Sequence, residues 1–110
     1  MIIEMHLTTE FFQLLKSGKK DIEIRLLDEK RSNLKVGDTI LFKCKNDVSP
    51  ASVVNISIYD SFEDMVKLID IKRIGNFTSS KDLLNALYNI YTKNKASNYK
   101  VLAIIIKRLV

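Results

Sequence analysis

The stretch Gly18-Lys19-Lys20-Asp21-Ile22-Glu23-Ile24-Arg25-Leu26 carries the clearest structural pattern in the chain. Polar and apolar residues alternate over residues 21–26, which is typical of a β-strand with one apolar and one polar face. The apolar members are expected on one face, and Glu23 and Arg25 on the other. Gly18 is expected to end a preceding helix, because glycine adopts the left-handed conformation of a helix C-terminus readily.

Four further strands are predicted from short β-rich runs. Residues 2–6 form the first, and residues 39–44 follow a turn-forming Gly-Asp pair. A third run at residues 51–59 lies close enough to the second for a hairpin, with a loop expected at residues 46–50. The last, residues 99–106, is almost continuously apolar, which favours a strand buried on both faces.

Two or three helices are predicted between these strands. Thr8 or Thr9 caps the first, whose apolar face is Phe11, Leu14 and Leu15. Ser61 precedes a helix at residues 62–69, and Ser79 or Ser80 caps another. The buried stripe expected of this last helix comprises Leu83, Leu84, Leu87, Ile90 and Tyr91. Residues 93–100 are expected to be a mobile basic connection. The pattern as a whole predicts an α+β fold, as a small barrel or a strongly curved sheet with helices beside it.

Composition limits the functions that the chain can have. Its 110 residues favour a single domain over residues 1–110. One cysteine and one histidine exclude disulfide frameworks and multi-cysteine or histidine-rich metal centres, so no metal or cofactor is predicted. Cys44 is interpreted as a core thiol and His6 as a surface or hydrogen-bonded residue. No secretory signal or membrane span is visible, so a cytoplasmic location and no membrane partner are expected. The net charge of +5 favours anionic partners such as nucleic acid or nucleotides.

The residues alone leave two interpretations of Glu23 and Arg25. They lie two apart on one strand face, close enough to touch. One interpretation is a solvated ion pair worth less than about 1 kcal/mol. The other places them in a concave site, where Arg25 holds a phosphate or carbonyl and Glu23 accepts from an exocyclic amine or ribose hydroxyl.

The opening stretch resembles the GxKxxExR signature of the ASCH domain, the activating-signal-cointegrator homology family, which is related to the PUA fold. Residues 27–31 with 34–38, residues 59–65 and residues 99–104 resemble later segments of the family in the same order. The chain therefore resembles a stand-alone, single-domain member. The resemblance implies a PUA-like, mixed or antiparallel β-barrel of about five strands with two to three flanking helices.

The same resemblance implies a cleft between barrel and helices that binds RNA or a nucleotide-like ligand. By position, the signature places Gly18, Lys20, Glu23 and Arg25 in that cleft. Lys30 and Arg31 are expected as nearby phosphate contacts because of their charge. The sequence shows no evident aromatic platform for stacking a base, since it contains no tryptophan and its tyrosines at 88 and 91 lie on or beside a helix stripe.

An alternative function is a small amidohydrolase acting on an acylated nucleoside such as N4-acetylcytidine. Some compact ASCH proteins use a lysine, a threonine and a glutamate for this reaction. Lys20 matches the lysine, but Glu23 occupies the threonine position. The glutamate would fall within residues 71–75, which contain no carboxylate, and Asp70 is the nearest acid. If the chain is an enzyme, a Lys20–Glu23 pair that activates water is the remaining catalytic candidate.

Overall fold

The structure is a computed structural model that describes residues 1–109, and its centre is one five-stranded sheet. The strands are β1 (Ile2–His6), β2 (Ile22–Leu26), β3 (Thr39–Cys44), β4 (Asp47–Tyr59) and β5 (Val101–Arg108). Their order in the sheet is β1-β3-β4-β5-β2. The pairing of β1 with β3 is parallel and every other pairing is antiparallel, so the sheet is mixed. The predicted α+β class and strand number are confirmed.

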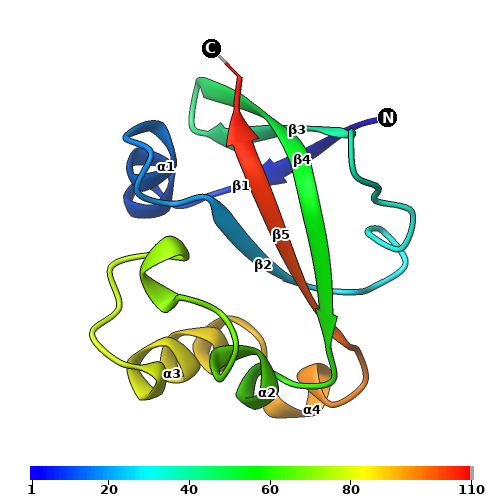
Figure 1. Cartoon of the computed structure of the whole chain (residues 1–110), viewed down its shortest axis with the longest axis vertical. Coiled ribbons are helices and arrows are strands. Elements are labelled where there is room, and N and C mark those ends of the chain that lie inside the picture. Colours follow the sequence, from blue (N-terminus) through cyan, green and yellow to red (C-terminus); the bar gives the residue numbers. More distant parts are fainter. Residues whose placement is uncertain (110) are drawn as a thin grey trace.

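Four α-helices accompany the sheet, rather than the two or three predicted. They are α1 (Thr9–Lys16), α2 (Phe62–Val66), α3 (Ser80–Ile90) and α4 (Lys93–Ala96), with a single 3₁₀ turn η1 (Ile71–Arg73). The extra helix is α4, in the segment expected to be a mobile connection. The Thr92 hydroxyl caps it by accepting from the Lys95 N–H. Helices α2, α3 and α4 gather at one end of the sheet, and α1 lies on its own beside β1 (Figure 1).

The hairpin between β3 and β4 is tighter than predicted. Its strands pair as far as Cys44 and Asp47, so only Lys45 and Asn46 form the turn. Lys45 has a φ of 55°, the left-handed conformation that two-residue hairpin turns require. The prediction of a loop at residues 46–50 is therefore wrong. Pro50 is tolerated in β4 because β4 pairs with β5 only from Ala51 onward. The missing N–H of the proline therefore costs no hydrogen bond of the sheet.

Strand β5 separates two clusters of core residues. Leu102, Ile104 and Ile106 face a cluster built with β1, β3, β4 and α1, which also buries Cys44. Val101 and Ala103 face the other way, into a cluster built with β2, α2 and α3. The apolar run of β5 is thus explained by burial on both faces, as the sequence predicted.

The two edge strands, β1 and β2, make the open side of the curled sheet. They do not pair with each other, so the sheet is a half-barrel rather than a closed barrel. One side chain bridges this side: Nη2 of Arg25 on β2 donates to the carbonyl oxygen of His6, at the end of β1, over 2.8 Å. Within residues 1–109, every helix falls short of the length and apolar character needed to cross a bilayer.

Candidate functional site

A cavity of about 250 Å³ lies on the open side of the half-barrel. Its wall is formed by the end of β1, helix α1, strand β2, the segment after η1 and one face of helix α3. Most of this wall is apolar and includes three aromatic side chains, Phe11, Phe77 and Tyr91. The polar residues that line it are His6, Thr8, Lys20, Glu23 and Arg25.

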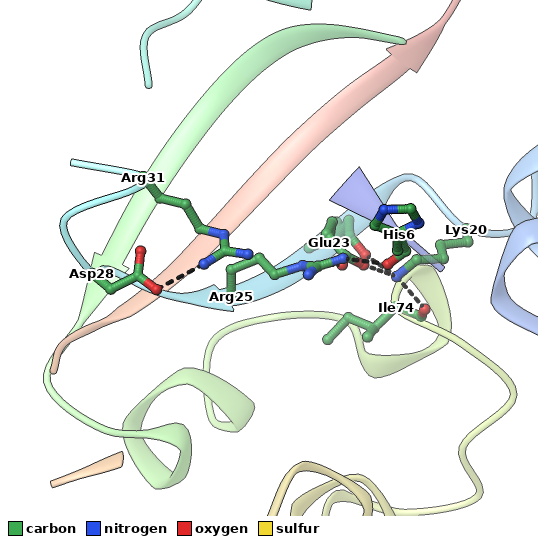
Figure 2. Close-up of polar contacts among 8 residues, drawn as sticks. His6, Lys20, Glu23, Arg25, Asp28, Arg31 and Ile74 are labelled. Carbon is green, nitrogen blue, oxygen red and sulfur yellow. Dashed lines mark hydrogen bonds and ion pairs between the residues drawn. The ribbon is translucent and has the colours of Figure 1, made fainter. Parts of the chain in front are cut away.

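Lys20 is buried at the back of this wall and is 3% exposed. Its Nζ donates to the carbonyl oxygens of Ile22 at 2.7 Å and Ile74 at 2.9 Å, and pairs with Glu23 Oε1 at 2.9 Å (Figure 2). The ammonium group thus has two carbonyl oxygens and one carboxylate oxygen as partners. The Phe11 ring also lies 5.5 Å from Nζ, in a cation–π contact. Lys20 therefore ties β2 to the Ile74 segment.

Glu23 lies between two cations and is 6% exposed. Its Oε2 accepts from Arg25 Nε over 2.6 Å, while its Oε1 faces Lys20. Burial alone would raise the pKa of the Glu23 carboxyl, but the charges and hydrogen bonds of Lys20 and Arg25 hold that pKa below its usual value of 4.5. Glu23 is thus an ionised acceptor. The interpretation of Glu23 and Arg25 as a solvated surface ion pair is wrong, because Glu23 is buried.

Arg25 has one nitrogen left over for a ligand. Its Nε is bound to Glu23 and its Nη2 to the His6 carbonyl, whereas Nη1 donates to none of residues 1–109. The side chain is 15% exposed and lines the cavity. Because both of its other nitrogens are held, the guanidinium has a fixed orientation, as recognition of a planar polar group requires.

The structure does not bring Gly18 into the cavity wall. Gly18 ends α1 with a φ of +82°, and its N–H bonds to the carbonyl oxygen of Leu15. The next N–H, of Lys19, bonds to the carbonyl oxygen of Leu14, which completes a Schellman motif. This turn reverses the chain so that Lys20 enters the interior.

Lys30 and Arg31 also lie outside the cavity wall. Arg31 pairs with Asp28 over 2.8 Å, at the end of Arg25 away from Lys20 (Figure 2). Nε of Arg31 and Oδ1 of Asp28 are buried without a hydrogen-bond partner among residues 1–109. Lys30 is exposed.

Sequence reasoning missed the aromatic part of the wall. Phe11 was expected in the buried face of the first helix, but its neighbour Phe12 occupies the core and Phe11 borders the cavity. Ile90 was expected in a buried stripe, yet it is 64% exposed at the cavity margin. Tyr91 is partly buried there, and this burial raises the pKa of its hydroxyl. Aromatic residues in helical periodicity do not reveal which of them will face a cavity.

Known proteins share this architecture. The family model of the ASCH domain matches residues 5–109. The chain belongs to the ASCH domain family. No curated protein matches it. The crystal structure of the hypothetical protein PH0355 superposes on this ASCH-domain protein with a TM-score of 0.91 and 34% identity, covering 99% of this chain and 100% of the other.

Two further solved structures support the fold. The solution structure of protein PF0455 from Pyrococcus furiosus has a TM-score of 0.80 and 34% identity, over 99% of this chain and 98% of the other. An ASCH domain from Lactobacillus crispatus has a TM-score of 0.68 at 10% identity, over 97% of this chain and 79% of the other. The curled five-stranded sheet of this ASCH-domain protein is thus the PUA-like fold of the family. Within residues 1–109, no three His, Cys, Asp or Glu side chains gather closely enough to hold a metal ion.

Proposed function

We propose that this ASCH-domain protein binds RNA or a nucleotide-like ligand, with the ligand's base in the cavity beside Glu23 and Arg25. The observation that carries the proposal is a fixed pair of opposite charges on the wall of a cavity that is otherwise apolar and aromatic. A nucleobase has the matching form, because its faces stack on aromatic rings while its edge carries donors and acceptors.

Each side chain has a distinct part in the proposed complex. Nη1 of Arg25 donates to a base carbonyl or a phosphate oxygen, and the ionised Glu23 accepts from an exocyclic amine or a ribose hydroxyl. Lys20 holds Glu23 in place, and Gly18 directs Lys20 inward. Lys30 and Arg31, outside the cavity, contact phosphates of the bound strand.

The size of the cavity restricts the ligand. Its volume of about 250 Å³ is below the roughly 300–1,000 Å³ of pockets for drug-sized molecules. One nucleobase or nucleoside is a suitable occupant, whereas a base paired in a duplex could not enter. The proposal therefore favours single-stranded RNA or a free nucleotide over double-stranded RNA.

The contacts of Lys20 favour binding over the alternative of amide hydrolysis. A lysine that activates a water or hydroxyl nucleophile must accept a proton. Here the Nζ of Lys20 donates to two backbone carbonyl oxygens, and its ammonium charge balances the buried Glu23 carboxylate. These contacts favour a role for Lys20 in holding the Glu23 carboxylate in position rather than in accepting a proton.

Fluorescence anisotropy of a labelled single-stranded RNA pool of about eight nucleotides tests the proposal; this length lies within the roughly 4–16 nucleotides that single-strand sites of OB folds cover. Arg25→Ala is expected to weaken binding by about 5- to 150-fold, the value of a charged contact of about 1–3 kcal/mol. Arg108→Ala is the matched control, because Arg108 is exposed and is not part of the lining of this cavity. Equal affinities of the two variants would remove the cavity as the binding site, and failure of the wild type to bind at low salt would exclude RNA.

A further inference from the structure

A second concavity, of about 590 Å³, opens on the other side of the segment that follows η1. We refer to it as the basic groove. Its lining includes three cationic side chains, those of Lys19, Lys72 and Arg73, followed by Asn76, Phe77 and Thr78. The cations come from two segments far apart in sequence, which the backbone hydrogen bond from Asp21 N–H to the Arg73 carbonyl oxygen holds together. The segment of η1 lies beside the start of β2 and below α1 (Figure 1).

The basic groove carries an uncompensated positive charge. Lys19 and Lys72 are exposed, and neither forms an ion pair with any of residues 1–109. Arg73 is paired with Asp21 through two nitrogens, at 2.8 and 3.0 Å. Asp70, the other acid close by, accepts from the backbone N–H of Lys72. Two of the three cations therefore remain available to an anionic ligand.

The basic groove and the cavity share a wall. Phe77 lines both, and consecutive residues of the two segments point to opposite sides. Lys20 and Ile74 line the cavity, while their neighbours Lys19 and Arg73 line the groove. A strand that leaves the cavity over Phe77 therefore passes directly into a row of cations.

We propose that the basic groove binds the phosphate backbone of a single-stranded RNA whose base occupies the cavity. This inference rests on the proposed function and identifies the ligand as a strand rather than a free nucleoside. Phosphates next to the inserted base lie against Lys19 and Lys72, which supply salt-dependent affinity without selecting a base. The Phe77 ring is the partition over which the chain bends.

Salt dependence of binding measures this contribution directly. For single strands, the slope of log K against log salt concentration changes by about 0.7 for each phosphate contact. Lys19→Ala/Lys72→Ala is therefore expected to reduce the magnitude of the slope by about 1.4. Because the counterion term vanishes near 1 M salt, this loss corresponds to about 25-fold weaker binding at about 0.1 M salt. The probe is the same labelled pool of single-stranded RNA.

Lys67→Ala/Lys107→Ala is the matched control. It removes the same charge from exposed lysines that line neither cavity nor groove and form no ion pair with residues 1–109. Equal slopes for the two double variants would overturn the groove proposal. If Arg25→Ala still weakened binding, the proposed function would stand without the groove. If the groove variant lost slope while Arg25→Ala bound like wild type, the groove would remain and the cavity would not be the base site.

Discussion

Lys19 and Lys20 are adjacent in the chain and have opposite environments. Lys20 is 3% exposed and has three oxygen partners, whereas Lys19 is exposed and pairs with no carboxylate among residues 1–109. The Schellman turn at Gly18 and the extended chain that follows it send the two side chains to opposite sides. Of these two adjacent lysines, Lys20 thus holds Glu23 and the Ile74 segment in position, whereas Lys19 supplies surface charge.

The same alternation occurs at the end of η1. Arg73 faces the basic groove, and its neighbour Ile74 faces the cavity and supplies the carbonyl oxygen that Lys20 binds. The wall therefore has a buried side, where hydrogen bonds and ion pairs hold a small number of polar atoms in fixed positions, and an exposed side, where Lys19 and Lys72 carry charge without an ion-pair partner among residues 1–109. In nucleic-acid recognition these are the two classes of contact, since base contacts specify and phosphate contacts position.

Replacement of each lysine by methionine should give the largest difference between the two sides. Lys20→Met leaves Glu23 buried with one cation, and leaves the carbonyl oxygens of Ile22 and Ile74 without their donor. Breaking a buried ion pair in this way is expected to lower the free energy of unfolding by about 3–5 kcal/mol. Lys19→Met should change it by less than about 0.5 kcal/mol. Urea denaturation monitored by circular dichroism measures both.

A third variant shows whether the stability lost in Lys20→Met comes from the buried Glu23 carboxylate that has lost its cation. In Lys20→Met/Glu23→Gln the buried carboxylate is removed together with its cation, so part of the lost stability should return. If Lys19→Met and Lys20→Met were equally stable, the contacts of Lys20 with Glu23 and the Ile74 carbonyl oxygen would not contribute to stability.

The local parts of this fold could be predicted from the sequence. Strand β2 follows from its period-two alternation, β5 from its apolar run, and the end of α1 from Gly18. The signature also brought Lys20, Glu23 and Arg25 to attention as a group, and the structure places them within contact of one another. The degree of burial of Glu23 did not follow from that pattern, because it depends on how closely the segment after η1 approaches β2.

The remaining features depend on contacts between distant segments. Helical periodicity could not decide whether Phe11 or Phe12 enters the core. The approach of Lys72 to Lys19 results from the docking of η1 against the start of β2, which no local pattern encodes. The start of β4 was missed, since its pairing with β3 and β5 decides whether the segment ending at Pro50 can join the sheet.

Substitution of Gly75 tests the wall that separates the cavity from the basic groove. A Cβ atom at this position would lie 2.8 Å from Cε2 of Phe77 and 2.9 Å from Cε1 of Phe11, so both rings would have to move. Gly75→Ala is expected to destabilise the protein by about 1–3 kcal/mol through overpacking and to weaken RNA binding.

Gly37→Ala is the control for this substitution. Gly37 has a φ of +94° and open space around its Cβ position, so alanine there is strained but displaces no ring. We expect a stability loss of about 1–2 kcal/mol for this variant with RNA affinity unchanged. Anisotropy and denaturation of the two variants separate the effects. Equal RNA affinities would mean that the positions of the Phe11 and Phe77 rings do not matter for binding.

Asp21→Asn should lower stability only slightly while it raises the affinity for RNA. The Asp21–Arg73 pair is more than 40% exposed on each partner, so its loss is expected to lower the free energy of unfolding by less than about 1 kcal/mol. The freed Arg73 should strengthen RNA binding and steepen the salt slope by up to about 0.7. Glu4→Gln removes the same charge from another ion pair, with the partly exposed Lys43, outside the groove. An equal gain in affinity for Glu4→Gln would attribute the effect to net charge alone, whereas a gain confined to Asp21→Asn would show that RNA responds to charge at the groove itself.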